Sequence, residues 1–296
     1  MVTVRAPATS ANLGSGYDVF GLALGRPADV IHVEAADETT ITVEGVGSEY
    51  VPEDPRDNTV GAVADALDAP ASITIDKGVR PSSGLGSSAA SAAGAAVALD
   101  TLYGLQTDPE ELVRVAAEGE AVVSGDAHAD NVAPAILGGF TIVTPDGITT
   151  LEASLSLVAC LPEIVVSTRD ARAVVPSTLS IDDLVDTVGS AATLTAGIAR
   201  DDPELVGQGM ADTVVTPTRS ALIDGYDEVR EAARLAGATG VTVSGAGPAV
   251  LAVCREGTRR AVASAMVDAF ADRGIESRAY QTNVGRGAEV VTRSAW

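Results

Sequence analysis

Residues 81–91 combine glycines and serines in a spacing that suits the binding of a phosphate. The stretch reads Pro-Ser-Ser-Gly-Leu-Gly-Ser-Ser-Ala-Ala-Ser, with two glycines around Leu85. It lies between a strand-like run and an Ala-rich segment, so we expect a tight turn that opens a helix. The N-terminus of a helix presents free backbone N–H groups and the positive end of its dipole, which favour a phosphate. Ser87 and Ser88 would lie in the first turn, where a hydroxyl can also ligate Mg²⁺.

This stretch is not a Walker A loop, because no Lys followed by Ser or Thr comes after its glycines. It therefore predicts a nucleotide site that differs from that of the P-loop NTPases. Taken alone, Gly84 and Gly86 fit equally well a simple turn before a close-packed helix. The other polar segments of the chain decide between these interpretations.

A second polar segment, residues 7–18, places hydroxyls, an amide and a carboxylate directly after a predicted strand. Asn12 and Asp18 are candidates for contact with a substrate. Alternatively, both side chains could bond the backbone of their own turn, as Asn and Asp often do.

A third polar segment follows a predicted helix that carries Glu120. We expect a loop after this helix to present His128, Asp130 and Asn131. Magnesium prefers carboxylate and water oxygens, so Glu120 could complete a metal site with a serine and phosphate oxygens. Glu118 is equally acidic, and spacing alone does not choose between the two glutamates.

Two further features are candidates for a functional site. Residues 244–248, Ser-Gly-Ala-Gly-Pro, form a Gly-rich turn after a predicted strand, although an ordinary hairpin connection would look similar. Arg172 follows another predicted strand, and Arg219 lies at the start of a predicted helix. A guanidinium can bind a carboxylate through two parallel hydrogen bonds. Most arginines of the chain, by contrast, are expected beside surface acids.

The charge of the chain excludes several classes of function. There are 41 acidic and 19 basic residues, a net charge of −22, and Lys77 is the single lysine. Such a chain does not bind nucleic acid through phosphate neutralisation. Dispersed acids with almost no lysine indicate a halophilic protein, since concentrated salt screens the repulsion. With two cysteines and two histidines, we expect neither a zinc site nor a disulfide framework.

No apolar run approaches the roughly 20 residues that span a bilayer, and the first residues lack the plan of a signal peptide. We therefore expect a cytoplasmic protein without a membrane partner.

The order of predicted elements indicates an α+β fold of two domains. Strands and helices alternate in residues 1–150, and residues 151–296 show a β-α-β-like layout over an antiparallel sheet. The helices expected around the polar segments cover residues 87–103, 109–123, 181–199 and 218–236, and a strand is expected at 163–167.

Three of these segments occur in the order typical of the GHMP kinases: residues 7–18, 81–91 and 244–248. Within that family, three stretches resemble the homoserine kinases most: residues 6–14 (APATSANLG), 128–134 (HADNVAP) and 167–172 (STRDAR). The resemblance covers essentially the whole chain. It implies an N-terminal domain like domain 2 of ribosomal protein S5, a ferredoxin-like C-terminal domain, and an active site between them.

The resemblance also implies an activity, namely transfer of the γ-phosphoryl group of ATP to the hydroxyl of L-homoserine, a step toward threonine. The residues implied to bind the nucleotide are Pro81, Ser82, Ser83, Gly84, Leu85, Gly86, Ser87, Ser88, Ala89, Ala90 and Ser91. Ser88 and Glu120 would hold Mg²⁺. The amino acid would be bound by Asn12, Asp18, Asp130, Arg172 and Arg219.

The catalytic residues implied are Asp130 and Asn131. Mevalonate kinases have an aspartate, thought to be a base, where this chain has Asn131, and an amide cannot take a proton. Phosphoryl transfer needs little covalent help from the protein, so we expect catalysis by positioning and charge, with Asp130 binding substrate. The alternatives are another small-molecule kinase of the family, for shikimate or mevalonate, or a non-catalytic binding protein. A homodimer is also expected from the family.

Overall fold

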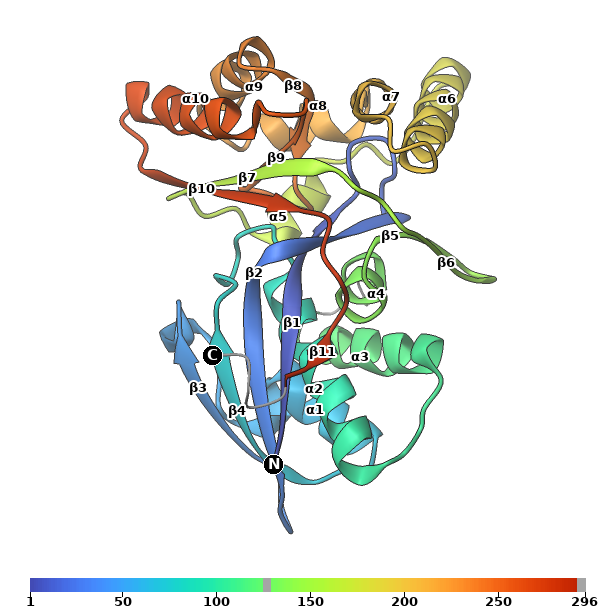
Figure 1. Cartoon of the computed structure of the whole chain (residues 1–296), viewed down its shortest axis with the longest axis vertical. Coiled ribbons are helices and arrows are strands. Elements are labelled where there is room, and N and C mark those ends of the chain that lie inside the picture. Colours follow the sequence, from blue (N-terminus) through green and yellow to red (C-terminus); the bar gives the residue numbers. More distant parts are fainter. Residues whose placement is uncertain (125–128, 292–296) are drawn as a thin grey trace.

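The computed structural model describes residues 1–124 and 129–291. Two β-sheets, each covered by helices, form its lower and upper parts in Figure 1. This arrangement confirms the predicted α+β class. Among the described residues, no helix is both long and apolar enough to cross a membrane.

The first sheet has seven strands in the order β11-β1-β2-β4-β3, and β5 pairs with both β2 and β6. Among the described strands of this sheet, only β3 and β4 pair in parallel. The long β2 bridges the sheet, pairing with β5 at its start and with β4 at its end. The strands are β1 (Val2–Ala11), β2 (Phe20–Ala35), β3 (Thr40–Gly45), β4 (Ala71–Lys77), β5 (Phe140–Thr144), β6 (Gly147–Leu151) and β11 (Glu289–Val290).

Four helices lie on one face of this sheet (Figure 1), where α2 and α4 pack against β1 and β2, and α3 packs against α1, α2 and α4. The buried residues of α2 are small, mostly alanine, which lets the helix approach β1 and β2 closely. A Cβ added at Gly94 would lie 2.5 Å from Ile31. The four helices are α1 (Thr59–Ala66), α2 (Ser87–Tyr103), α3 (Pro109–Ser124) and α4 (Ala129–Leu137), and two short 3₁₀ turns, η1 (Ser48–Tyr50) and η2 (Pro55–Asp57), precede α1.

The second sheet is antiparallel, with the order β10-β7-β9-β8. In Figure 1 most of its helices lie on the far side from the first sheet. Its strands are β7 (Ser156–Pro162), β8 (Ala238–Val243), β9 (Val250–Cys254) and β10 (Ser277–Asn283). Its helices are α5 (Thr168–Ala173), α6 (Ile181–Ile198), α7 (Pro203–Gly209), α8 (Val215–Ser220), α9 (Tyr226–Leu235) and α10 (Arg259–Asp272).

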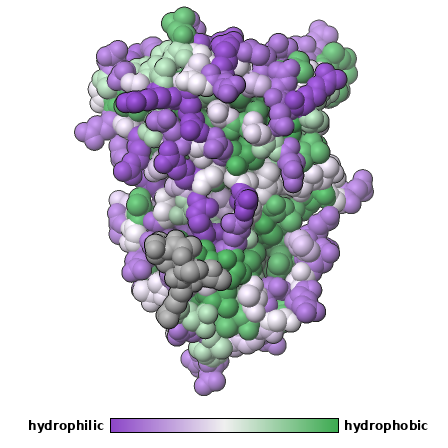
Figure 2. All heavy atoms as spheres, viewed as in Figure 1, coloured by the Kyte–Doolittle hydropathy of each residue, from purple (hydrophilic) through white to green (hydrophobic). Residues whose placement is uncertain are grey.

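A hydrophobic core joins the two sheets. Phe20 of β2 and Phe140 of β5 pack edge to face, with ring centroids 5.0 Å apart, and this cluster continues into Leu157 and Leu251 of the second sheet. After β10 the chain returns to the first sheet, where Val290 of β11 pairs with Val4. Hydrophilic residues cover most of the upper part of the face in Figure 2, as the acid-rich composition predicts.

Three expectations about local structure were wrong. Residues 163–167 form no strand, and the turn after β7 leads directly into α5. The helix expected over residues 218–236 is divided into α8 and α9, because Gly225 adopts a left-handed conformation (φ 83°) at the N-cap of α9. Asp130 and Asn131 lie in the first turn of α4 rather than in a loop, whereas His128 lies outside the described residues.

Candidate active site

A cavity of about 320 Å³ lies where the polar segments of the sequence meet. One part of its wall is formed by the end of β1 with the segment after it and by the loop that precedes α2. The other part is formed by the helices α3, α4, α5 and α8 and by the turn after β8. Residues from every predicted group line it, including Asn12, Asp18, Ser82, Ser88, Glu120, Asp130, Asn131, Arg172, Arg219 and Gly245. The structure thus brings these distant segments together around one cavity.

The loop at residues 81–86 is held tightly between the two other motifs. Gly86 has φ 64° and caps α2, and an added Cβ there would lie 2.0 Å from Thr9 Oγ1. An added Cβ at Gly84 would lie 2.6 Å from the carbonyl oxygens of Ser244 and Gly247. Only glycine fits both positions, so the loop can turn sharply and present the N-terminus of α2 to the cavity.

Three of the residues predicted to bind nucleotide do not line the cavity. Leu85 is buried within the loop, and Ala89 and Ala90 are buried in α2. The Leu85 carbonyl also accepts a hydrogen bond from Thr9 N at 3.0 Å. The remaining members of the segment line the cavity.

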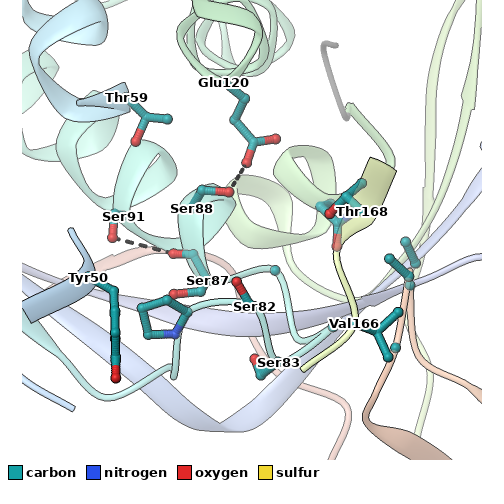
Figure 3. A pocket seen from close by; sticks show the side chains of 18 of the residues that line it. Tyr50, Thr59, Ser82, Ser83, Ser87, Ser88, Ser91, Glu120, Val166 and Thr168 are labelled. Atoms are coloured by element: carbon teal, nitrogen blue, oxygen red, sulfur yellow. Dashed lines mark hydrogen bonds between the residues drawn. The ribbon is translucent and has the colours of Figure 1, made fainter. Parts of the chain in front are cut away.

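Ser88 and Glu120 form a close polar pair in the site. Ser88 Oγ, in the first turn of α2, donates to Glu120 Oε1 of α3 at 2.5 Å (Figure 3). Glu120 is buried, whereas Glu118 is exposed on the opposite face of the helix. The structure therefore selects Glu120 of the two glutamates. Among the residues described, no group of three His, Cys, Asp or Glu side chains suits a metal ion by itself.

Burial raises the pKa of Glu120 from 4.5 to about 7, and the nearby Asp130 charge adds to this while the Ser88 hydrogen bond opposes it. The folded protein thus binds the proton of the Glu120 carboxyl more tightly than the unfolded chain does. The free energy of unfolding of the protein therefore falls as pH rises from 4.5 to 7. A Glu120→Gln variant lacks this dependence. We expect it to exceed the wild type in stability by up to roughly 3 kcal/mol at about pH 8, and to match it near the ordinary pKa of glutamate.

Chemical denaturation at constant KCl across this pH range measures the difference. Glu118→Gln, at an exposed site on the same helix, is the control and is expected to follow the wild type. Parallel pH profiles for Glu120→Gln and the wild type would contradict the assignment.

Asp130 and Asn131 face the cavity from the start of α4. Thr9 Oγ1 donates to Asn131 Oδ1 at 3.0 Å, and Asn131 Nδ2 donates to Asp130 Oδ1 at 3.3 Å. Both ends of the amide are therefore engaged, and Asn131 orients the Asp130 carboxylate. Burial and the neighbouring Asp18 charge raise the pKa of Asp130 from 3.8 to about 6.

The two predicted arginines occupy different environments near Asp18. Arg172 of α5 is half-buried and pairs with Asp18, with 3.2 Å between Nη1 and Oδ2. Arg219 of α8 is 4% exposed and lies over the Tyr17 ring, 5.0 Å from its centroid. Both arginines thus lie close enough to Asp18 and Asp130 for their charges to interact at this end of the cavity.

The Asn12 side chain bonds to backbone groups, which is one of the two alternatives that its sequence context left open. Its Oδ1 accepts from Asp18 N at 3.0 Å, and its Nδ2 donates to the Gly245 carbonyl at 3.2 Å. The side chain joins the first motif to the Gly-rich turn after β8. Contact of Asn12 with a substrate stays a prediction.

Comparisons with known proteins agree with this geometry. Residues 58–139 match the family "GHMP kinases N terminal domain" and residues 194–272 match "GHMP kinases C terminal". A protein named homoserine kinase from Halorubrum lacusprofundi is 71% identical over 98% of this chain and 99% of its own. The chain belongs to the homoserine kinase group of the GHMP kinases.

Further members of the group support this assignment. The homoserine kinase of Haloarcula marismortui is 70% identical, over 98% of this chain and 100% of its own length. The crystal structure of homoserine kinase from Cytophaga hutchinsonii has a TM-score of 0.91 and 34% identity, and the match covers 98% of this chain and 97% of that one. The haloarchaeal relatives fit the predicted halophilic character. As a GHMP kinase, the protein uses ATP to phosphorylate a hydroxyl group.

Part of this kinase site was not predicted. Tyr50, Val51 and Pro52 line the cavity beside the loop at residues 81–86, which we call the phosphate loop, together with residues 57–59. Tyr50 is 75% exposed in a chain with only 3% aromatic residues, and this rarity is the signal that could have drawn attention to it. Val166 and Thr168 close another side of the cavity (Figure 3), and Lys77 reaches it from below.

Proposed function

We propose that the protein transfers the γ-phosphoryl group of ATP to the side-chain hydroxyl of L-homoserine, giving O-phospho-L-homoserine and ADP. The supporting observation is the cluster of Asp18, Asp130, Arg172 and Arg219 at one end of the cavity. A free amino acid carries an ammonium and a carboxylate, and such a cluster offers a partner for each. The names of the curated relatives point to the same substrate.

Nucleotide phosphates are proposed to lie against the N-terminus of α2. The loop at residues 81–86 supplies backbone N–H groups, and the helix dipole favours negative charge there. The homoserine hydroxyl would then approach from the side of α4, past Asp130 and Asn131.

The donor set at Ser88 and Glu120 fits Mg²⁺. A hydroxyl and a carboxylate oxygen lie 2.5 Å apart, and hard cations prefer such oxygen ligands, with phosphate oxygens and waters completing the shell. Bound Mg²⁺ would neutralise charge on the phosphates. Ser88 and Glu120 would hold the ion, and with it the phosphates, in a fixed position relative to the acceptor hydroxyl.

We infer that the side chains act mainly by positioning. Asn131 cannot accept a proton, and its amide fixes the Asp130 carboxylate. With its pKa raised to about 6, Asp130 is ionised at neutral pH and can hold the substrate ammonium. The loose transition state of phosphoryl transfer depends chiefly on alignment and charge, so the site does not require a strong base.

Shikimate and mevalonate carry a carboxylate but no ammonium, so either substrate would leave the acids Asp18 and Asp130 without a cationic partner on the ligand. A non-catalytic binding protein would have no use for the Ser88–Glu120 pair. The homodimer and the cytoplasmic location stay predictions.

ADP release in molar KCl with Mg²⁺ tests the proposal. We expect homoserine to raise the rate well above the acceptor-free background, and shikimate and mevalonate to leave it unchanged. Turnover of shikimate or mevalonate, with none of homoserine, would refute the proposed substrate.

A further inference from the structure

The single lysine of the chain lies beneath the phosphate loop. Lys77 ends β4 and is 2% exposed. Its ammonium donates to the Asp29 carboxylate, to the Ser87 carbonyl at 2.9 Å and to Ser91 Oγ at 2.8 Å. An ammonium has three N–H donors, and here each of them has an acceptor within the protein.

Asp29, on β2, is fully buried and binds both ends of the same loop. Its Oδ1 accepts from Gly78 N at 3.0 Å and Val79 N at 2.9 Å, just before the loop. Its Oδ2 accepts from Lys77 and, at 2.8 Å, from Ser91 Oγ in α2. The ion pair thus fixes where the chain enters the loop and where it leaves.

We propose that Lys77 and Asp29 are positioning residues that hold the phosphate loop and the first turn of α2 in the conformation that binds ATP. This inference rests on the proposed nucleotide site. Lys77 borders the cavity, but its donors point at the Asp29 carboxylate, the Ser87 carbonyl and the Ser91 hydroxyl. It therefore acts on the nucleotide through the loop and not as a phosphate ligand.

The composition of the chain supports a specific need for lysine at this position. The chain has 19 basic residues, and all except Lys77 are arginine. Three acceptors around one point match a compact ammonium, whereas a planar guanidinium carries five donors in a fixed fork. An arginine here would bury donors without acceptors and would press against α2, whose residues next to the sheet are small.

The buried pair also keeps the local charge balanced. A lone ammonium beneath the loop would be costly to bury, and a lone carboxylate would repel the phosphates. Burial lowers the pKa of Lys77, and the Asp29 carboxylate opposes that shift. Together the two side chains are neutral, so the N-terminus of α2 remains the source of positive potential for the nucleotide.

A double variant separates positioning from simple stability. Lys77→Met alone would leave the buried Asp29 carboxylate without a cationic partner, and this could unfold the protein. Asp29→Asn combined with Lys77→Met removes both charges. The amide introduced at position 29 can still accept from Gly78 N and Val79 N through its oxygen, and its NH₂ group can donate to Ser91 Oγ. Replacing a buried ion pair by neutral groups often leaves stability unchanged, while the bond from Lys77 to Ser87 is lost.

The matched control is the ion pair of Arg80 and Glu163. It flanks the same loop, with 2.6 Å between the paired atoms, but it is exposed, so Arg80→Met with Glu163→Gln should leave ligand binding unchanged. Isothermal titration in molar KCl with a non-hydrolysable ATP analogue and with homoserine, alongside thermal unfolding, measures all variants.

We expect the Asp29→Asn/Lys77→Met variant to fold and to bind the ATP analogue roughly 10-fold or more weakly, a change of about 1.4 kcal/mol, because the loop and the first turn of α2 lose the Lys77 contacts that hold them. Homoserine affinity should stay within about twofold of the wild type, a change of roughly 0.4 kcal/mol. The Lys77→Arg variant, which keeps the positive charge, should also bind the ATP analogue more weakly than the wild type. A folded double variant with wild-type affinity for the analogue overturns the inference, whereas a wild type that fails to bind the analogue overturns the proposed function instead.

If the double variant does not fold, Ser91→Ala decides. This change keeps both charges and removes only the hydroxyl that bridges Asp29 and Lys77. We expect analogue affinity to fall roughly threefold with homoserine affinity unchanged, and an unchanged analogue affinity would overturn the inference.

Discussion

Glu120→Gln and Ser88→Ala are each expected to lower kcat by roughly 10²–10³-fold, the usual loss when one group that stabilises transition-state charge is removed. The reason is their position. Both side chains lie beside the N-terminus of α2, with their oxygens 2.5 Å apart, where negative charge on the transferred phosphoryl group would develop. Steady-state kinetics with homoserine and ATP in excess Mg²⁺ measures the effect.

The same substitutions should leave the fold intact, and Glu120→Gln should even stabilise it at about pH 8, because it removes a buried charge. A loss of kcat together with a gain in stability is typical of a functional residue placed at a cost to folding. Glu118→Gln serves as the matched control, since Glu118 is exposed on the same helix. Near-full activity of both Ser88→Ala and Glu120→Gln would remove these residues from the proposed metal site.

Arg219→Leu is expected to weaken homoserine binding by roughly 30-fold or more, because loss of one partner of a charge-assisted contact in a closed site costs about 2–5 kcal/mol. The structure makes this arginine rigid. It donates to the Ala171 carbonyl at 3.1 Å and to the Gly245 carbonyl at 2.9 Å, and it stacks on Tyr17. We expect Arg172→Leu to act in the same direction with a smaller effect, since Arg172 is half-exposed and pairs with Asp18.

Calorimetric titration of homoserine and of an ATP analogue separates these effects. Nucleotide affinity should change little in either variant. Arg169→Leu is the control, because Arg169 lies on the same α5 helix, is exposed and does not line the cavity. Unchanged homoserine affinity in both Arg172 and Arg219 variants would show that these arginines are structural.

Local sequence patterns predicted the parts of the site that depend on neighbouring residues. The glycines at 84 and 86, followed by serines and alanines, correctly placed the start of α2 at Ser87. The pairing of Glu120 with Ser88 was implied by the resemblance to the GHMP kinases, and the two side chains lie within hydrogen-bond distance. For the loop and the helix, turn chemistry and helix periodicity were sufficient.

Other features depended on contacts between distant segments. Lys77 received no role, because its partners at residues 29, 87 and 91 meet only when β2, β4 and α2 pack together. Asp130 and Asn131 were expected in a loop, because a helix of nine residues that contains Pro134 gives only a weak local signal. The choice between Glu118 and Glu120 likewise required knowing which face of α3 is buried.

The return of the chain to the first sheet has a consequence for synthesis. The segment before β11 bonds to the first sheet through Gly285 N to the Ala23 carbonyl at 2.8 Å, and Val291 N donates to the Thr3 carbonyl at 2.8 Å. Every described strand of the second sheet precedes this segment in the chain. A nascent chain on the ribosome must therefore carry a first sheet with an open edge along β1 until the entire second sheet has emerged. Folding of the two halves cannot be completed in the order in which they are translated.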